Sequence, residues 1–225
     1  MGIHIGSKPI VTDGLVFLVD SSDFASYPRA GSSWFDLSEN SNTGTINGSP
    51  SLEGDGSLAF DGSNDYVVHG DDTSIDLTTA ASYCIWLNPS AAVNSRPFCR
   101  DDGGSNRNWW FYMYNDGTMW FSVMSGDANK AINHGSSWSV GAWHYYVGTY
   151  DSATGTKLYR NGVQVGTNSW SGTADNDDVS LAVGAYASGN QKFNGKISSA
   201  SLYNRALTDA EIIQNFNSKK DIYGL

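Results

Sequence analysis

Short apolar segments recur along most of this 225-residue chain, and turns rich in Gly, Asn and Asp separate them. Asn161 and Gly162 form the clearest turn, because both accept the positive φ angles that a two-residue type I′ hairpin requires. Many short strands at regular spacing indicate an all-β sandwich or barrel. The pattern predicts strands at about 14–20, 58–61, 65–69, 82–88, 96–101, 109–115, 118–124, 142–150, 156–161, 163–168, 179–184 and 192–203.

One helix is expected near the C-terminus. Thr208 and Glu211 are spaced as a capping box, and Ile212, Ile213 and Phe216 then form an apolar stripe. The chain shows no internal repeat or linker. We therefore expect an N-terminal arm (1–13), one β-sandwich (14–207), and a C-terminal helix and tail (208–225) that pack on the sandwich or on a neighbouring subunit.

The charge balance excludes several classes of partner. The formal net charge is −10, whereas proteins that bind nucleic acid or anionic lipid need a basic face. The N-terminus has no basic segment, and the apolar run 15–19 is too short for a signal peptide or a membrane span. We therefore expect no nucleic-acid partner, no membrane insertion, and synthesis and retention in the cytosol.

The two cysteines, Cys84 and Cys99, are predicted on neighbouring strands. A disulfide between them is geometrically open, but the expected cytosolic setting favours two reduced, packed thiols. Nothing in the sequence has the spacing of a Cys or His metal site.

Several segments, in this order, resemble the laminin-G-like, concanavalin-A-like lectin jelly roll. The resemblance covers roughly residues 14–217 and implies an antiparallel β-sandwich with one short C-terminal helix, a fold that mainly holds surfaces and sugars. The matching segments are 58–67 (LAFDGSNDYV), 83–89 (YCIWLNP), 141–151 (GAWHYYVGTYD), 157–165 (KLYRNGVQV), 193–197 (FNGKI) and 203–212 (YNRALTDAEI).

The superfamily also contains glucanases, whose catalytic strand reads Glu-x-Asp-x-x-Glu and holds two carboxylates about 5–5.5 Å apart. The nearest match here is 53–58 (EGDGSL), in which Leu58 replaces the second Glu and two Gly indicate a turn. No Gly-x-Ser-x-Gly motif accompanies the four histidines. We therefore expect no enzymatic activity.

Calcium is the one metal that the resemblance suggests, because related modules hold Ca²⁺ at the rim of the sandwich with loop oxygens. The candidate ligands are Asp61, Asn64 and Asp65 in one loop, and Asp175, Asn176, Asp177 and Asp178 in another. The alternative is that these are solvated turn residues. The family often has an acidic residue after the Ile of the last strand, whereas this chain has Ser198 after Ile197.

Sugar binding would use exposed aromatic rings for stacking. Our candidates are Trp109, Trp110, Trp138 and Trp170, with Trp120 also available. Trp109 and Trp110 are neighbours on one strand, so one should point inward and the other outward. Trp138 and Trp170 lie in loops, where their alternative role is to cover the ends of the sandwich.

The opening 6–16, the segments 26–28 and 34–37 and the ending 215–219 resemble laminin-G-like virion proteins of marine bacteriophages. This resemblance implies a non-enzymatic virion surface protein, either a capsid decoration or a tail-associated adhesin. It would contact other coat subunits or itself, and host glycans in the adhesin case. The alternatives are a calcium-assisted carbohydrate-binding module of cellular origin and, third, a glycoside hydrolase.

Overall fold

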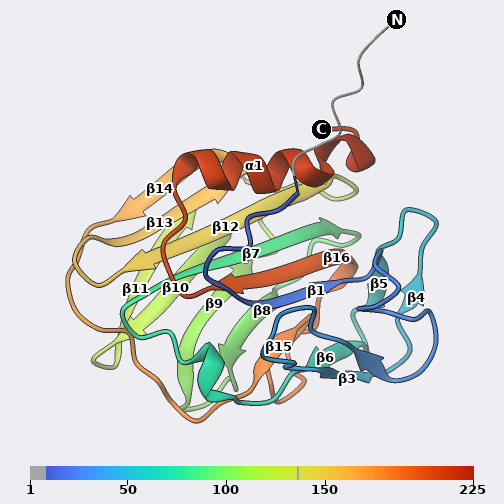
Figure 1. Ribbon diagram of the computed structural model, residues 1–225, viewed down its shortest axis with the longest axis horizontal. Coiled ribbons are helices and arrows are strands. Elements are labelled where there is room, and N and C mark those ends of the chain that lie inside the picture. The colour runs from blue at the N-terminus through green and yellow to red at the C-terminus, as the bar shows by residue number, and fades with distance from the viewer. Residues whose placement is uncertain (1–8, 136) are drawn as a thin grey trace, which may run out of the picture.

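In the computed structural model, which describes residues 9–135 and 137–225, the chain forms two antiparallel β-sheets that pack into a sandwich (Figure 1). The first sheet has the order β14 (Val163–Asn168), β13 (Gly155–Arg160), β12 (His144–Asp151), β7 (Ala80–Pro89), β16 (Asn194–Tyr203), β5 (Leu58–Asp61) and β4 (Ser51–Leu52). β1 (Leu15–Asp20) pairs with residues 199–203 of β16, next to the residues of β16 that pair with β5.

The second sheet has the order β11 (Ala128–His134), β10 (Met119–Ser125), β9 (Arg107–Met113), β8 (Ser95–Asp101), β15 (Leu181–Val183), β6 (Tyr66–Val68), β3 (Gly44–Asn47) and β2 (Ser33–Trp34). A 3₁₀ turn, η1 (Thr73–Ile75), follows β6. Each of these pairings is antiparallel, so the predicted all-β sandwich is confirmed.

The core lies between the two sheets because alternate residues of each strand point inward. Tyr83 of β7 packs on Trp109 of β9 with ring centroids 4.3 Å apart, and on Phe121 of β10 at 5.5 Å. Gly148 of β12 makes room for the Phe121 ring, since a Cβ there would lie 2.4 Å from it. The hairpin turn is confirmed as well: Asn161 and Gly162 have φ angles of 51° and 82° and connect β13 to β14.

The single α-helix of the described chain, α1 (Asp209–Lys219), covers the outer face of the first sheet. Its predicted capping box is confirmed: the Glu211 N–H donates to Thr208 Oγ1, and Glu211 Oε2 accepts the Thr208 N–H at 2.8 Å. Phe216 of α1 stacks on Trp86 of β7 at 5.7 Å. No helix that the structure describes is long and apolar enough to cross a membrane.

Residues beyond the sandwich pack on this same helix-covered face. The Val11 N–H donates to Asn215 Oδ1 of α1 at 2.8 Å, and the Val11 carbonyl accepts from Tyr203 at 2.9 Å. After α1, the chain forms η2 (Lys220–Tyr223), whose Tyr223 ring stacks on Trp143 at 3.9 Å. Residues 9–13 of the expected arm and the tail therefore contact their own domain, while residues 1–8 lie outside the described residues.

The structure corrects the expected placement of the cysteines. Cys84 lies in β7 of the first sheet and packs under α1, whereas Cys99 lies in β8 of the second sheet and packs on its outer face. Both thiols are buried and unpaired with each other. Burial raises the pKa of Cys84 to about 12 and raises the pKa of Cys99 further, so both are inert packing residues.

Candidate functional site

Two of the four candidate tryptophans are core residues. Trp109 is 3% exposed and packs between the sheets, and Trp138 is 7% exposed and belongs to the same core. The Trp138 indole N–H donates to the Thr118 carbonyl at 3.1 Å. Although Trp138 lies in a loop, neither ring has a free face, so the expectation that these two side chains stack on a sugar is not supported.

Trp110 points the other way, as the alternation along β9 requires, and lies on the outer face of the second sheet. It is only 4% exposed because Tyr186 and neighbouring side chains pack around it. The next outward residue of β9, Tyr112, is half-buried, and so is Tyr114 just beyond the strand. α1 covers the other sheet, so no helix of the described chain covers these rings.

Tyr112, Tyr114 and Trp120 form a continuous row of partly exposed rings on this face, here called the aromatic row. The centroids of Tyr112 and Tyr114 lie 4.1 Å apart, and those of Tyr114 and Trp120 lie 5.6 Å apart. Trp120 of β10 is the direct cross-strand partner of Tyr112. The ladder between β9 and β10 thus sets the spacing of the row.

Arg96 of β8 lies beside this row, enclosed by three rings. Its guanidinium carbon lies 3.6 Å from the centroid of Tyr112, 5.0 Å from that of Tyr186 and 5.4 Å from that of Trp110. Such distances place the cation over aromatic faces, an arrangement that stabilises a desolvated charge. The residue is 7% exposed.

An acidic residue balances part of this charge. Asp101 Oδ2 lies 3.7 Å from Arg96 Nε, and Asp101 Oδ1 lies 3.6 Å from Nε of the more exposed Arg107. Burial raises the pKa of Asp101, although the Gly103 N–H and the two arginines act in the opposite direction. The outer face of the second sheet therefore combines an apolar row with a charged cluster of two arginines and Asp101, and Asp102 is close enough to raise the pKa of Asp101 further.

Trp170, the fourth candidate, lies elsewhere, at the end of the sandwich. It is half-buried and stacks on Tyr150 with a centroid distance of 5.2 Å and an interplanar angle of 11°. Lys130 lies 5.7 Å from its centroid. One face of the ring is therefore used for packing, and Trp170 is separate from the aromatic row.

The first group of predicted calcium ligands is engaged in turn structure. Asp65 is buried, and its carboxylate accepts the N–H groups of Ser49 at 2.7 Å and Asp61 at 3.0 Å. The Asp61 carboxylate accepts from Ser63 at 2.7 Å and from Asn64 at 3.1 Å. These bonds to backbone N–H groups, the Ser63 bond foremost, lower the pKa of Asp61. They explain the acidic loop without a bound ion.

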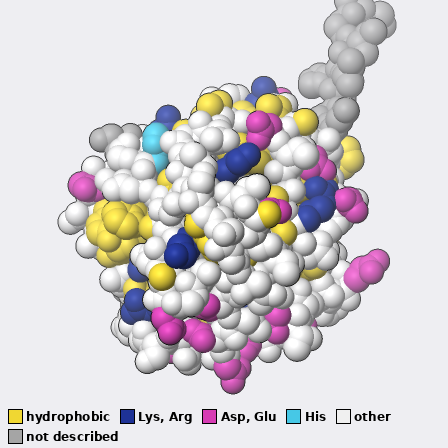
Figure 2. Space-filling view, turned by 90° about the vertical axis from the view of Figure 1, so that its left-hand side faces the viewer, with side chains coloured by type: hydrophobic (Ala, Val, Ile, Leu, Met, Phe, Trp, Pro, Cys, Tyr) yellow, Lys and Arg dark blue, Asp and Glu magenta, His cyan; other side chains and the backbone are white. Residues whose placement is uncertain are grey.

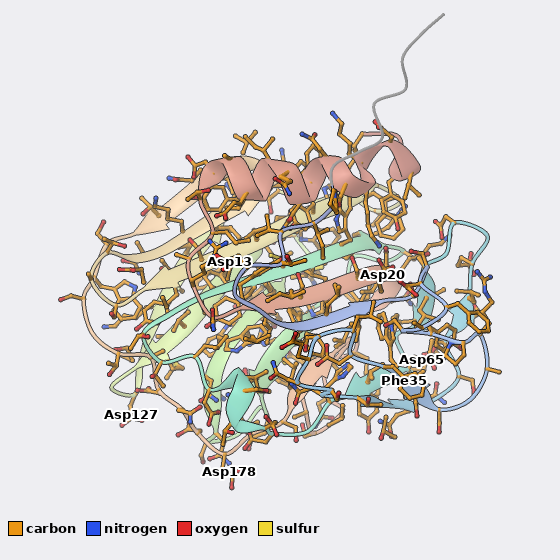
Figure 3. The ribbon with its side chains drawn as sticks, in the orientation of Figure 1. Asp13, Asp20, Phe35, Asp65, Asp127 and Asp178 are labelled. Atoms are coloured by element: carbon orange, nitrogen blue, oxygen red, sulfur yellow. The ribbon has the colours of Figure 1, made fainter. Side chains whose placement is uncertain are left out.

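The second group of predicted calcium ligands, residues 175–178, makes hydrogen bonds in different parts of the structure. The Asp175 carboxylate accepts the N–H groups of Gly126 and Asp127 at 2.7 and 3.0 Å, which closes the turn between β10 and β11. Asp177 accepts the Arg107 N–H at 2.8 Å. Figure 3 shows Asp178 at the lower end of the molecule and Asp65 at a different edge, so the two groups are separate.

Asp178 instead joins acidic residues that the sequence alone did not connect with it. A cleft of about 310 Å³ is lined by Asp71, Asp72, Thr73, Asp76, Asn176, Asp177 and Asp178. Acidic side chains also gather along the lower edge of the face in Figure 2. Arg100 is buried next to this cleft and donates to Asp71, to Asp76 at 3.0 Å and to the Val179 carbonyl at 3.1 Å.

Arg100 is therefore the counter-ion of the acidic cleft. Burial raises the pKa of Asp71, and its hydrogen bond with Asp178 raises it further. Within residues 9–135 and 137–225, no three His, Cys, Asp or Glu side chains are arranged to hold a metal ion.

The glucanase-like segment is a turn, as its glycines suggest. Glu53 follows β4, and Lys196 of β16 lies 3.0 Å from Glu53 and 3.9 Å from Asp55. The Lys196 hydrogen bond lowers the pKa of Glu53, whereas a catalytic acid requires a raised value. This segment therefore lacks the properties of a glycosidase acid.

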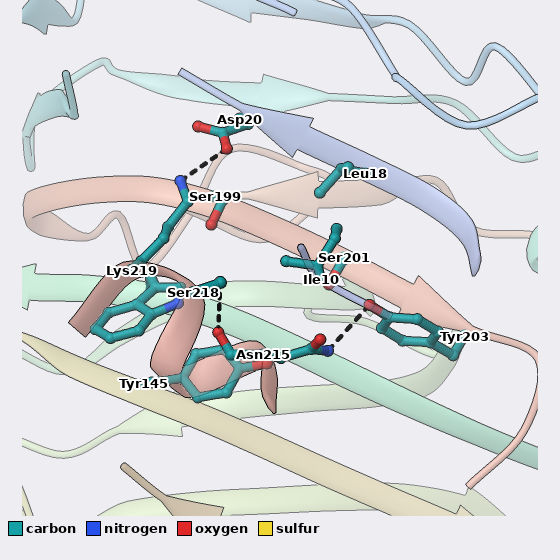
Figure 4. A pocket seen from close by; sticks show the side chains of 11 residues that line it. Ile10, Leu18, Asp20, Tyr145, Ser199, Ser201, Tyr203, Asn215, Ser218 and Lys219 are labelled. Atoms are coloured by element: carbon teal, nitrogen blue, oxygen red, sulfur yellow. Dashed lines mark hydrogen bonds and ion pairs between the residues drawn. The ribbon is translucent and has the colours of Figure 1, made fainter. Parts of the chain in front are cut away.

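A further cavity lies between α1 and the first sheet (Figure 4). It measures about 30 Å³, enough for one water molecule. Lys219 pairs with Asp20 at 2.8 Å on one side, and Asn215 donates to the Tyr203 hydroxyl at 3.0 Å on the other. These contacts fix the helix on the sheet, so the cavity is a packing feature.

A two-sheet antiparallel sandwich is an architecture found in lectin domains. The chain belongs to the Concanavalin A-like lectin/glucanases superfamily, since the Laminin_G_3 family model matches residues 61–213. The resemblance to that superfamily seen in the sequence is thereby confirmed. No curated protein matches the chain significantly.

Solved structures share the fold at low sequence identity. The receptor-binding domain of botulinum neurotoxin C/D mosaic serotype aligns with a TM-score of 0.72 and 14% identity over 93% of this chain and 52% of that chain. The binding domain of botulinum neurotoxin DC in complex with SialylT gives 0.70 and 14% over 92% and 52%. Trypanosoma rangeli sialidase in complex with sialic acid gives 0.70 and 16% over 96% and 34%. The chain thus spans about half the length of the two toxin domains.

Proposed function

We propose that this chain is a non-enzymatic glycan-binding domain and that the aromatic row on the second sheet is its binding surface. The observation that carries the proposal is the row itself: Tyr114 contacts both Tyr112 and Trp120, and the three rings are partly exposed on a face that no described helix covers. Sugar rings stack on such rigid aromatic surfaces, which lose little conformational entropy on binding.

The comparisons support a sugar as ligand, because two of the similar structures are complexes with SialylT and with sialic acid. The charged groups support a non-enzymatic role. Glu211 caps α1, and its hydrogen bonds with Arg205 and Thr208 lower its pKa to about 2. Glu53 is paired with Lys196 and Glu39 is a loop residue, so no glutamate is placed as a protonated acid.

A glycan array with matched variants tests the proposal. Trp120→Ala should abolish binding and leave the melting temperature within a few degrees of wild type, since Trp120 is not a core residue. Phe24→Ala is the control, because Phe24 is 66% exposed and distant in sequence from the row. If Trp120→Ala binds as wild type does, the aromatic row is not the binding surface. Loss of binding in Trp170→Ala alone would move the site to the end of the sandwich.

The same array, run in millimolar calcium and in EDTA, separates the two roles open to the aspartates. We expect equal binding in both buffers, because Asp61, Asp65, Asp175 and Asp177 already accept backbone N–H groups. Binding that requires calcium would favour the calcium-assisted module of cellular origin.

We also propose that the domain works on the surface of a virus particle, as capsid decoration or tail-associated adhesin, in contact with other coat subunits. The support is the sequence resemblance of segments 6–16, 26–28, 34–37 and 215–219 to phage proteins. Deletion of residues 1–8 should prevent incorporation into particles and leave the domain folded. Residues 9–13 must be kept, since Val11 is buried against Asn215 and Tyr203. Normal incorporation of the truncated protein would contradict this role of the arm.

A further inference from the structure

Arg96 is the most unusual charged residue on the aromatic face. Its side chain is about nine-tenths buried, yet Nε and Nη1 have no hydrogen-bond partner among the described residues. Arg100, four residues later on the same strand, is equally buried but donates to Asp71, Asp76, Asn176 and two backbone carbonyls. The chain therefore gives every nitrogen of one buried guanidinium an acceptor and leaves two nitrogens of the other without one.

The aromatic rings do not replace these acceptors. Cation–π contacts act on the flat faces of the guanidinium, whereas its five N–H donors lie in the plane and require acceptors at the edge. Asp101 Oδ2 is the nearest acceptor, at 3.7 Å from Nε, and this oxygen also lacks a hydrogen-bond partner in the described chain. A buried donor without an acceptor is destabilising, more so when it is charged.

Arg96 offers a ligand one nitrogen rather than an edge, because Nε and Nη1 are both enclosed. Nη2 is the guanidinium nitrogen that is not among the enclosed, unpartnered atoms, so it is the one that remains accessible. The guanidinium lies directly over Tyr112, which is the first ring of the aromatic row. A ligand stacked along the row would therefore meet this nitrogen. Arg96 and Arg107 flank the carboxylate of Asp101, and Asp102 and Asp116 are near enough to act on Asp101 and Tyr114, so it is the direct contact with Arg96 that favours an anion there.

We infer that the glycan bound by the aromatic row is acidic, and that a sugar carboxylate accepts a hydrogen bond from Arg96 Nη2 while the sugar ring stacks on Tyr114 and Trp120. Uronic acids and sialic acids both present this carboxylate, and a hydrogen bond from a guanidinium N–H to a carboxylate is charge-assisted. The inference rests on the proposed glycan-binding function and adds the class of sugar to it. The net charge of −10 repels anions from the molecule as a whole, so the direct contact with Arg96 has to supply the attraction.

The first test uses the unaltered full chain and changes only the ligand. Calorimetric titrations compare oligogalacturonate and sialyllactose with their methyl esters, which keep the sugar ring and lose the negative charge. We expect each acid that binds to do so at least about tenfold more tightly than its ester, since hydrogen bonds to charged groups are the strong ones. The two acids show which source of carboxylate is recognised.

The second test uses variants of Arg96. Arg96→Gln should reduce binding of the acid to the level of the ester while binding of the ester is kept. Arg96→Lys should recover only part of the difference, because an ammonium does not stack flat on Tyr112 as the guanidinium does. Arg29→Gln is the matched control, an exposed arginine distant from the row. If Arg96→Gln fails to fold, the comparison of acid and ester on the wild-type chain still shows whether the sugar carboxylate contributes to binding.

The outcomes separate the inference from the proposed function. Equal affinity for acids and esters, with loss of both in Trp120→Ala, would overturn the inference and leave the glycan-binding function standing. Binding of sulfated glycans but of no carboxylated ones would also overturn it. If the wild-type chain binds no glycan of any kind, both fall together.

Discussion

Two buried histidines should make this protein lose stability as the pH falls from 7 to 5. His69 is 4% exposed and packs edge-on against Phe17, and His144 is 7% exposed at the start of β12. Burial is the main cause that lowers the pKa of each to about 4 from the ordinary 6.5, and Arg160 contributes to the lowering for His144. His69 Nε2 and His144 Nδ1 have no hydrogen-bond partner in the described chain, so neither ring is prepared to carry a second proton.

Proton linkage gives the direction in which the free energy of unfolding changes with pH. Below pH 6.5 the unfolded chain binds a proton at each histidine and the folded chain does not, so the free energy of unfolding decreases until the pH reaches about 4. Between pH 7 and 5 this amounts to about 2 kcal/mol for each histidine, or about 4 kcal/mol together, by the relation between pKa shifts and free energy. Domains of this size have about 5–15 kcal/mol in total, so the effect should be large.

Urea unfolding followed by tryptophan fluorescence at pH 7, 6 and 5 measures this dependence. His144→Gln should lower the starting stability and remove about half of the decrease between pH 7 and 5, because one of two titrating groups is gone. The carboxylates contribute mainly at lower pH, although the raised pKa values of Asp101 and Asp71 act in the opposite direction. A free energy of unfolding that is equal at pH 7 and 5 would refute the argument, as would a variant with the full wild-type decrease.

Three further substitutions test the packing. Gly148→Ala should destabilise the domain by about 1–3 kcal/mol in urea unfolding, because the added Cβ would lie 2.4 Å from the Phe121 ring. An unchanged free energy of unfolding would mean that the Phe121 ring moves aside freely. Thr208→Ala removes the N-cap of α1 and should cost about 1 kcal/mol, whereas Thr208→Ser should cost less; equal losses would point away from the cap. Trp138→Ala should lower the free energy of unfolding by about 3–5 kcal/mol, since the ring is in the core. An unchanged melting temperature together with lost glycan binding would instead identify Trp138 as a ligand-binding residue.

Features of the fold that depend on neighbours in sequence were predictable. The turn at Asn161 and Gly162 depends on two adjacent φ angles, and the cap of α1 depends on Thr208 and Glu211, three residues apart. The opposite directions of Trp109 and Trp110 follow from the alternation of a strand. The same alternation places Tyr112 and Tyr114 on the face of Trp110, so the sequence of β9 already contained a signal for the aromatic row.

Only the tertiary structure decided which distant residues meet. β11 was not predicted because it is a polar edge strand with little apolar pattern to mark it. Asp71 and Asp178 share a cleft across more than a hundred residues of chain, and Cys84 and Cys99 lie in different sheets although they are close in sequence. The environment of Arg96 combines β8, β9 and the turn that holds Tyr186. Local sequence determines the direction of a side chain, but its partners depend on how the two sheets pair and pack.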